Sequence, residues 1–238
     1  MSQVNNTLLF GNGHLGQFLL KILPEISWTS RSKNGGVHFD LEQSESFELD
    51  DNFTTIIWAI PPHQKTINFF QNISKSTKII YISSTSVFSV GSINNESEKS
   101  PMTKNAKLLD QVESYLQDNF PLSIIIRPGG LVDEKRHPRK FFTNAAQMKN
   151  SHHTPNLIHT EDVARFIHHC MDSKVKFGAF NLVAPMKKTK KEFYGRFLND
   201  TNIQYLNDDS TGKSFDTSWM NQLNFSLKYP DLFEYFKN

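Results

Sequence analysis

The sequence predicts an α/β protein built on a doubly wound parallel sheet, with helices on both faces. Two observations predict this class. Strand-like and helix-like segments alternate from the first residues onward. The first strand also runs directly into the glycine pattern G-x-G-x-x-G, which opens an apolar helix. The elements are therefore expected to follow one another as strand and crossover helix.

The predicted strands are short and apolar, as expected for strands that are buried on both faces of a parallel sheet. The run 54–60 shows this most clearly, because it is almost wholly apolar and ends at Pro61-Pro62. In chain order the predicted strands cover residues 6–10, 25–29, 54–60, 78–82 and 123–127.

The predicted helices are recognised by apolar positions at helical spacing or by signals at their ends. The first covers 14–23 and is stopped by Pro24, and the second covers 63–73. A third covers 104–118, a fourth begins after Thr160, and a fifth begins at a capping box, Thr189-Lys190-Lys191-Glu192. The residues expected to face inward are Leu108, Leu109, Val112, Tyr115 and Leu116 in the third helix, Val163, Phe166, Ile167, Cys170 and Met171 in the fourth, and Phe193, Phe197 and Leu198 in the fifth.

The glycine pattern Gly11-Asn12-Gly13-His14-Leu15-Gly16 lies between the first strand and the first helix. Its glycines allow a tight turn, let the backbone approach a pyrophosphate, and bring helix and strand close together. The helix N-terminus adds unpaired N–H groups and a positive dipole, both of which favour phosphate. A fortuitous turn is the alternative, but the flanking strand and helix favour a Rossmann-type sheet that binds a dinucleotide.

The residues after the second strand favour NADP(H) over NAD(H). An NAD site carries an Asp or Glu about 20 residues past the glycines, whereas this chain has Ser30-Arg31-Ser32 there. A guanidinium offers paired donors and a fixed positive charge to a 2′-phosphate. An ordinary surface arginine is the alternative. Asp40, followed by Leu41, could accept from the adenine amino group, or it could be an exposed loop aspartate.

The composition excludes several classes of function. The chain has 238 residues, enough for one α/β domain with a modest appendage, and its net charge of +2 gives no reason to expect nucleic acid. Cys170 is the one cysteine, so neither an internal disulfide nor a cysteine zinc site is possible. The adjacent histidine pairs 152–153 and 168–169 do not complete a metal set. With no signal segment or membrane span in the pattern, we expect a cytoplasmic protein that binds no membrane and no metal.

Several motifs in a fixed order resemble the extended short-chain dehydrogenase/reductase superfamily, whose members include NAD(P)-dependent epimerases and dehydratases. The resemblance covers nearly the whole chain, although the glycine spacing and the short length indicate an atypical branch. Besides the glycine turn, the motifs are Ala59-Ile60-Pro61-Pro62, the run 81–88 (Tyr-Ile-Ser-Ser-Thr-Ser-Val-Phe), Arg127-Pro128-Gly129-Gly130, the run 158–164 (Ile-His-Thr-Glu-Asp-Val-Ala), Gly212-Lys213-Ser214, Leu223-Asn224-Phe225 and Tyr229-Pro230.

The resemblance implies where the chemistry would occur. Ser84 matches the family's catalytic hydroxyl, which hydrogen-bonds a substrate oxygen. The family's Tyr-x-x-x-Lys pair is incomplete, because alignment on Lys107 puts Thr103 in the tyrosine position and alignment on Pro101 puts Met102 there. A threonine hydroxyl is far less acidic than a phenol, so proton transfer of the family type is compromised. Lys107 would reach the nicotinamide ribose, or it is an exposed helical lysine.

The resemblance also implies a binding cleft. Ala59, Ile60, Pro61 and Ser83 would contact the cofactor, together with the glycine turn. A small substrate-binding part is expected mainly from about residues 129–160 and 185–238 of a single domain, 1–238. Glycines in such a cleft permit close backbone approach, and an arginine there could clamp an anion. The residues expected to bind substrate are Thr85, Arg127, Gly129, Gly130 and Arg136.

Two functions follow from the sequence. The first is an NADP-dependent oxidoreductase that acts on a small polar carbonyl or sugar-derived substrate without the family's tyrosine. The second is a non-catalytic NADP(H)-binding protein that senses redox state. A monomer and a homodimer stay open, since the helix 104–118, which the family often uses for dimerisation, carries polar Gln111, Glu113 and Gln117.

Overall fold

The central sheet of the protein is parallel throughout, as the sequence predicts. The computed structural model describes residues 6–32, 36–89, 91, 99–141, 147–172, 175–198 and 203–237. Within these residues seven strands pair in the order β10-β6-β5-β4-β1-β2-β3. The strands are β1 (Thr7–Phe10), β2 (Ser27–Ser30), β3 (Val37–His38), β4 (Thr55–Trp58), β5 (Lys78–Ile82), β6 (Ser123–Pro128) and β10 (Gly178–Leu182).

The strand order reverses beside β1, whose two neighbours are β2 and β4. The chain first winds outward from β1 to β2 and β3, and then returns to place β4, β5, β6 and β10 on the other side. In an open α/β sheet, ligands bind outside the carboxyl ends of the strands at such a switch point. The glycine loop lies directly after β1, so it lies at this point.

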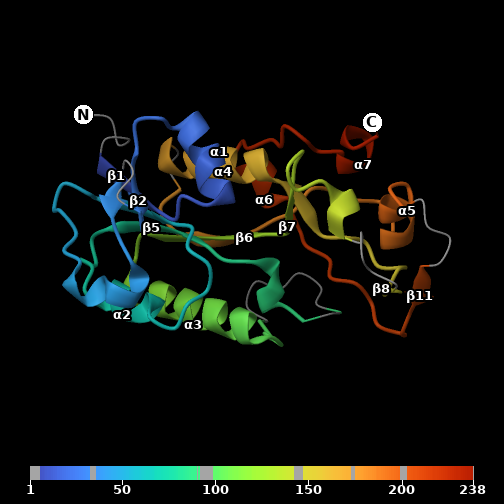
Figure 1. The fold of residues 1–238 in the computed structure, drawn as a ribbon, viewed down its shortest axis with the longest axis horizontal. Helices are drawn as coiled ribbons and strands as arrows, with labels where there is room; N and C mark the ends of the chain where they lie inside the picture. Colours follow the sequence, from blue (N-terminus) through green and yellow to red (C-terminus); the bar gives the residue numbers. More distant parts are fainter. Residues whose placement is uncertain are drawn as a thin grey trace.

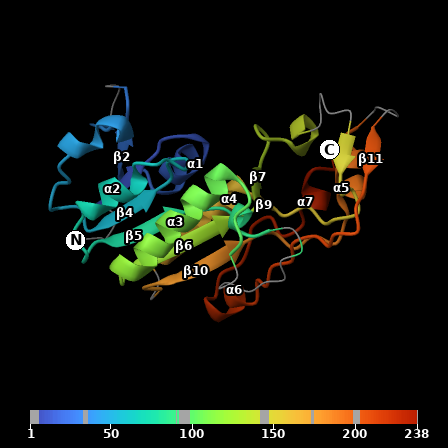
Figure 2. The ribbon, with the colours of Figure 1, turned by 90° about the horizontal axis from the view of Figure 1, so that it is seen from below.

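Helices cover both faces of the sheet, and each face has its own core (Figures 1 and 2). α1 (His14–Ile22) and α4 (Thr160–Asp172) lie together on one face, and α2 (Thr66–Gln71) and α3 (Lys104–Asn119) lie on the other. Successive side chains of β1 point to opposite faces of the sheet. Leu9 therefore packs in the core on the side of α1 and α4, and Leu8 and Phe10 pack in the core on the side of α2 and α3. Cys170 is buried on α4 as predicted, and burial raises the pKa of its thiol to about 12.

A smaller region begins where β6 ends. Figure 1 shows it beyond one end of the sheet, where β7, β8, β11, α5 and α7 gather. β7 pairs with β9 and β8 pairs with β11, both in parallel. Residues 142–146, 199–202 and 238 of the predicted substrate-binding part lie outside the described residues. The elements of this region are β7 (Gly130–Val132), β8 (Gln147–Lys149), β9 (Leu157–His159), α5 (Lys190–Gly195), β11 (Gln204–Leu206), α6 (Trp219–Gln222) and α7 (Leu232–Tyr235).

The predicted elements are present with altered ends, whereas several observed elements had no prediction, namely β3, β7, β8, β9, β10, β11, α6 and α7. The helix predicted over 63–73 is α2, which begins only at Thr66 and ends at Gln71, while His63 lies before it and contacts Glu42 at 2.9 Å. The fifth helix has the predicted capping box but ends at Gly195. The described residues contain no helix that is long and apolar enough to cross a membrane.

Candidate functional site

The glycine loop is shaped by contacts that leave no room for side chains at two of its three glycines. Gly11 has φ of +104°, and a Cβ there would lie 2.7 Å from the carbonyl carbon and oxygen of Ala59, just past β4. A Cβ on Gly16 would lie 2.4 Å from the Gly11 carbonyl oxygen. Gly11 therefore allows the turn against β4, and Gly16 allows α1 to pack on the loop.

Gly13 differs from these two glycines, because a Cβ there would have no protein atom within 4 Å. Gly13 is also the N-cap of α1, and no side chain caps the helix at this end. The first N–H groups of α1 are thus left for water or a ligand. Open space in front of a glycine, together with an uncapped helix N-terminus at the switch point, fits a cofactor pyrophosphate.

His14 links this helix end to the smaller region. Its Nε2 lies 2.6 Å from Oδ2 of Asp133, a fully buried carboxylate just after β7. The backbone N–H groups of Lys135 and Arg136 donate to the other oxygen at 2.9 and 3.0 Å, and the Thr160 hydroxyl donates to Oδ2. Burial alone would raise the pKa of Asp133, but the hydrogen bonds from Thr160 and His14 outweigh it and lower that pKa. Asp133 is therefore charged, and His14 Nε2 must donate to it.

The residues expected at the adenosine end lie after β2. Arg31 and Ser32 are exposed, and the Ser32 N–H donates to Ser30 Oγ at 3.2 Å. Asp40 accepts from the Glu42 N–H at 3.0 Å, so it caps the short helix Leu41–Ser46. Leu41 is buried in the core beside β1. The arginine side chain is thus open to solvent, whereas the Asp40 carboxylate has one local partner.

Three residues follow the carboxyl end of β5, two strands from the glycine loop. Ser84 Oγ accepts from the Ser86 N–H at 3.1 Å and caps the turn Thr85–Val87. No described residue accepts the hydroxyl proton of Ser84, which stays available to a ligand. Ser83 instead donates to the buried carboxylate of Glu113 on α3, and Thr85 is buried.

Glu113 and Arg127 form a buried ion pair behind this turn. The Arg127 guanidinium on β6 is 1% exposed, and its Nη2 lies 2.8 Å from Glu113 Oε2. Lys99 adds a second cation at 3.2 Å, and the guanidinium lies over the Phe88 ring. Glu113, one of the polar residues that left the oligomeric state open, is fully buried. This guanidinium is turned into the interior and paired with Glu113. A substrate contact by Arg127 stays a prediction.

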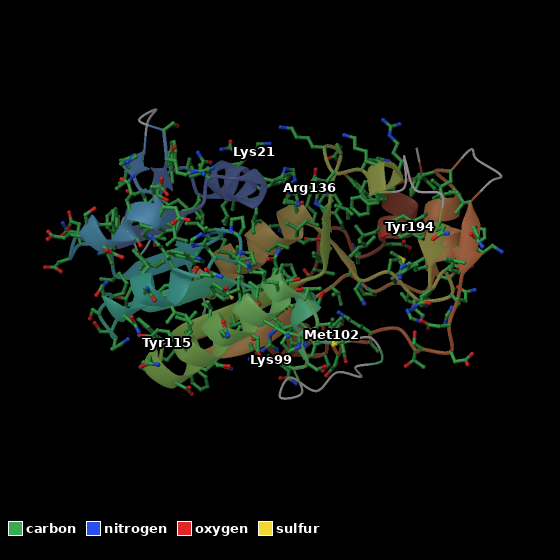
Figure 3. All side chains as sticks on the ribbon, turned by 60° about the horizontal axis from the view of Figure 1, so that its bottom comes forward. Lys21, Lys99, Met102, Tyr115, Arg136 and Tyr194 are labelled. Atoms are coloured by element: carbon green, nitrogen blue, oxygen red, sulfur yellow. The ribbon has the colours of Figure 1, made fainter. Side chains whose placement is uncertain are left out.

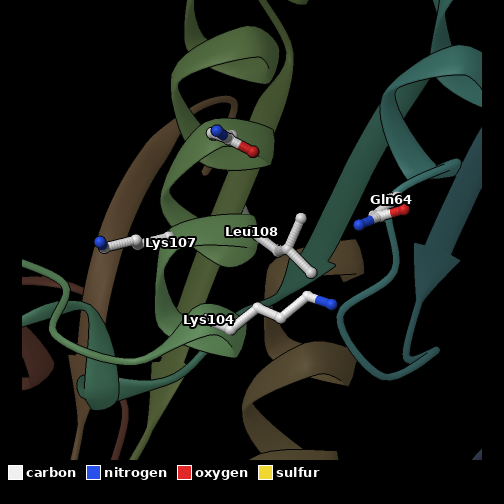
Figure 4. A pocket seen from close by; sticks show the side chains of 5 residues that line it. Gln64, Lys104, Lys107 and Leu108 are labelled. Atoms are coloured by element: carbon white, nitrogen blue, oxygen red, sulfur yellow. The ribbon is translucent and has the colours of Figure 1, made fainter.

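The Thr103 and Lys107 positions lie at the beginning of α3. Thr103 Oγ1 accepts from the Ala106 N–H at 3.1 Å and is the N-cap of the helix. Met102 beside it is 77% exposed, and Figure 3 shows it near Lys99, with Tyr115 further along the helix. Lys107 is exposed and helps to line a pocket of about 540 Å³. Figure 4 shows Lys104 directed toward Gln64 across this pocket, and Lys107 directed the other way.

The remaining predicted residues lie past β6. The Gly129 N–H donates to the Leu182 carbonyl on β10, and the Gly130 N–H donates to the Asn156 carbonyl before β9. A Cβ on Gly129 would lie 2.7 Å from the Asn156 carbonyl oxygen, so a glycine here allows the two backbone segments to pass close to each other. Arg136 is exposed and is labelled in Figure 3. The described residues hold no cluster of three or more His, Cys, Asp or Glu that could bind a metal.

Sequence reasoning did not assign Asp133, Glu113 or Lys213 to the site. The Lys213 ammonium donates to the Thr85 carbonyl oxygen at 3.2 Å, although 128 residues separate them. Its motif, Gly212-Lys213-Ser214, was available as a signal, since it is one of the motifs of the resemblance. Asp133 and Glu113 carried no local signal, because only the folded chain brings their partners to them.

No model of a known protein family matches the sequence. The chain is 32% identical to Protein YeeZ of Escherichia coli (strain K12) over 163 residues, which are 65% of this chain. It thus spans about 59% of the length of that curated relative.

Solved structures resemble the fold at low identity. The human epimerase family protein SDR39U1, determined with NADPH, matches with a TM-score of 0.74 and 13% identity over 97% of each chain. A putative NAD-dependent epimerase/dehydratase from Methylobacillus flagellatus matches with a TM-score of 0.72 and 14% identity over 96% of this chain and 94% of that one. This chain therefore has the fold of the epimerase/dehydratase-like short-chain dehydrogenases/reductases, the superfamily that its motifs resemble.

Proposed function

We propose that this chain binds NADP(H) at the glycine loop and catalyses the reduction of a carbonyl group, or its reverse, on a small polar substrate. The observation that carries the proposal is the loop itself. Gly11 and Gly16 are required by packing, whereas Gly13 faces open space at an uncapped helix end. Protein packing gives no reason for the glycine at position 13, but a pyrophosphate against the backbone would require it.

The residues that would hold the cofactor are spread along the carboxyl ends of three strands. The loop after β1 would take the pyrophosphate, and the segment after β4, including Ala59 and Ile60, lies against it. Arg31, exposed after β2, would pair with a 2′-phosphate, for which the planar guanidinium is suited. The solved structure of SDR39U1 with NADPH supports this choice of cofactor class. A bound nicotinamide supplies or accepts a hydride.

The chain's own contribution at the reacting carbon centres on Ser84. Because its Oγ already accepts from the Ser86 N–H, the hydroxyl is oriented and its proton is directed to another acceptor. A substrate oxygen held there would receive a hydrogen bond as its charge increases during reduction. Reduction needs less acid assistance than a full epimerisation, and this favours a reductase in a chain that carries Thr103 or Met102 at the position aligned with the family's tyrosine.

Turnover tests this function directly. Purified protein with NADPH should reduce at least one carbonyl of a panel that contains phenanthrenequinone, diacetyl and a UDP-keto-sugar. The reaction is monitored by the loss of NADPH absorbance. The Ser84→Ala variant should lose about 100-fold or more in kcat, the usual contribution of such a group, and should keep its affinity for NADPH. Unchanged turnover in Ser84→Ala would show that the site is assigned to the wrong residue.

Cofactor preference has a separate test. The Arg31→Asp variant should bind NADPH at least tenfold more weakly, because an acid there repels the 2′-phosphate. NADH lacks that phosphate and is the matched control ligand, so its affinity should be unchanged or improved. An unchanged ratio of the two affinities would refute the role of Arg31.

A second candidate function is non-catalytic NADP(H) binding, as in a redox sensor. The residues in its favour are Thr103 and Met102, neither of which is a phenol, at the positions that align with the family's tyrosine. Tyr81 on β5 is buried, and burial raises the pKa of its hydroxyl far above the ordinary value. NADPH binding without turnover of any panel member would favour this candidate over the reductase.

A further inference from the structure

The segment 207–213 is fastened along its length to the residues between β8 and β9. The Ser151 N–H and hydroxyl both donate to Asn207 Oδ1, at 2.8 and 3.0 Å. His153 Nε2 lies 2.7 Å from the Ser210 carbonyl oxygen, and Asn156 Nδ2 donates to the Lys213 carbonyl oxygen at 3.3 Å. These bonds fix the path of the backbone up to Lys213, so the position of this lysine is built into the fold.

The side chain of Lys213 then reaches the turn that holds Ser84. Its Nζ donates to the Thr85 carbonyl oxygen at 3.2 Å. Two residues further on, the Phe215 ring packs on Phe88, which follows the same turn, with 5.5 Å between ring centroids. The ammonium is thus held against the turn Thr85–Val87, which Ser84 caps, and the segment is fixed on both sides of Lys213 along the chain.

The electrostatic surroundings of this ammonium are unusual for a lysine. It is half-buried, and among the described residues no carboxylate lies within 4.0 Å of it, so burial lowers its pKa without a compensating charge. The titratable groups on the neighbouring segments have partners of their own. These are His153 with the Ser210 carbonyl, Asp208 with Ser210, Asp216 with Ser218, and Arg127 with Glu113.

We propose that Lys213 donates a proton to the substrate oxygen, in place of the absent phenol. This inference rests on the function proposed above. As the carbonyl carbon receives a hydride, one N–H bond of the Lys213 ammonium breaks and an O–H bond forms on the substrate, while Ser84 hydrogen-bonds the same oxygen. The product is an alcohol, the lysine is left neutral, and water returns its proton. The bond to Thr85 uses one of the three ammonium protons and leaves two for this purpose.

A purely structural lysine would behave differently on substitution. Arginine keeps the charge and can still bond the Thr85 carbonyl, but it does not release a proton at neutral pH. Lys190 is a matched control, because it is also half-buried, burial lowers its pKa, and it donates to one backbone carbonyl, that of Lys149. Lys190 belongs to α5 and not to the Ser84 turn.

The test measures kcat, KM and NADPH affinity for wild type, Lys213→Arg and Lys190→Arg, with the panel carbonyl that the wild type reduces. We expect kcat of Lys213→Arg to fall about 100-fold or more, with NADPH affinity and KM within twofold of wild type, and Lys190→Arg to be unaffected. Retained kcat in Lys213→Arg would overturn this inference alone. Failure of the wild type to bind NADPH, or to reduce any panel member, would overturn the proposed function and the inference with it.

A second readout needs no cofactor. Lysines can be dimethylated with labelled formaldehyde and followed by NMR, and the Lys213 signal is the one missing from Lys213→Arg. We expect that signal to titrate at lower pH than those of the exposed lysines. A Lys213 signal that titrates together with them would overturn the inference.

Discussion

Substitution of Gly13 by alanine should weaken NADPH binding without lowering the stability of the fold. Since a Cβ at this position would meet no protein atom within 4 Å and φ is −83°, alanine fits the protein alone. The free energy of unfolding should therefore change by less than about 0.5 kcal/mol, as for surface substitutions. Gly13→Ala should leave the thermal unfolding midpoint close to that of the wild type.

The bound state should respond in the opposite way. If the pyrophosphate packs against the Gly13 backbone, the added methyl group overfills that contact, and overpacking costs about 1–3 kcal/mol. This energy corresponds to an NADPH affinity about 5- to 150-fold weaker. Isothermal titration calorimetry measures the dissociation constant, and differential scanning calorimetry measures the midpoint.

Gly195→Ala is the matched control, because a Cβ there also meets no atom within 4 Å, at the end of α5. It should bind NADPH as the wild type does. Gly13→Ala that binds NADPH with unchanged affinity would refute the placement of the pyrophosphate. A large loss of stability in Gly13→Ala would refute the claim that its surroundings are open.

Three further substitutions test the packing around the site. Gly16→Ala places a Cβ 2.4 Å from the Gly11 carbonyl oxygen, so the unfolding free energy in urea should fall by about 1–3 kcal/mol; wild-type stability would contradict the close packing. Glu113→Ala leaves the Arg127 guanidinium buried without its bidentate partner and should cost about 3–5 kcal/mol by the same measurement, whereas a loss below 1 kcal/mol would contradict the ion pair. For Asp133, a folded-state pKa below the unfolded value of about 3.9 means that its stabilisation is present at neutral pH and is lost as the pH falls through the folded pKa. Asp133→Asn should therefore be less stable at neutral pH and lose less stability than the wild type on acidification, and parallel losses would refute this.

The sheet and the glycine loop could be predicted because their signals are local. Lys78–Ile82 has the predicted bounds, and the Gly11–Gly16 turn lies between a strand and a helix as expected. Strand β10 was missed because its sequence, Gly-Ala-Phe-Asn-Leu, is only partly apolar and is stabilised by pairing with β6. Tertiary pairing overrides a weak local preference in such a case.

The charged interior could not be predicted for a different reason. Glu113 sits among polar positions of α3, and its burial depends on Arg127, which is 14 residues away on another element. Lys213 and Thr85 are separated by 128 residues, and no spacing rule connects them. Periodicity reports which face a residue lies on, but it does not report which distant charge meets it there.

Binding of a pyridine nucleotide by the unmodified protein tests the central claim most directly. Titration calorimetry of the folded wild type should show uptake of NADPH at a single site, with weaker uptake of NADH. A folded protein that takes up neither nucleotide would contradict the account.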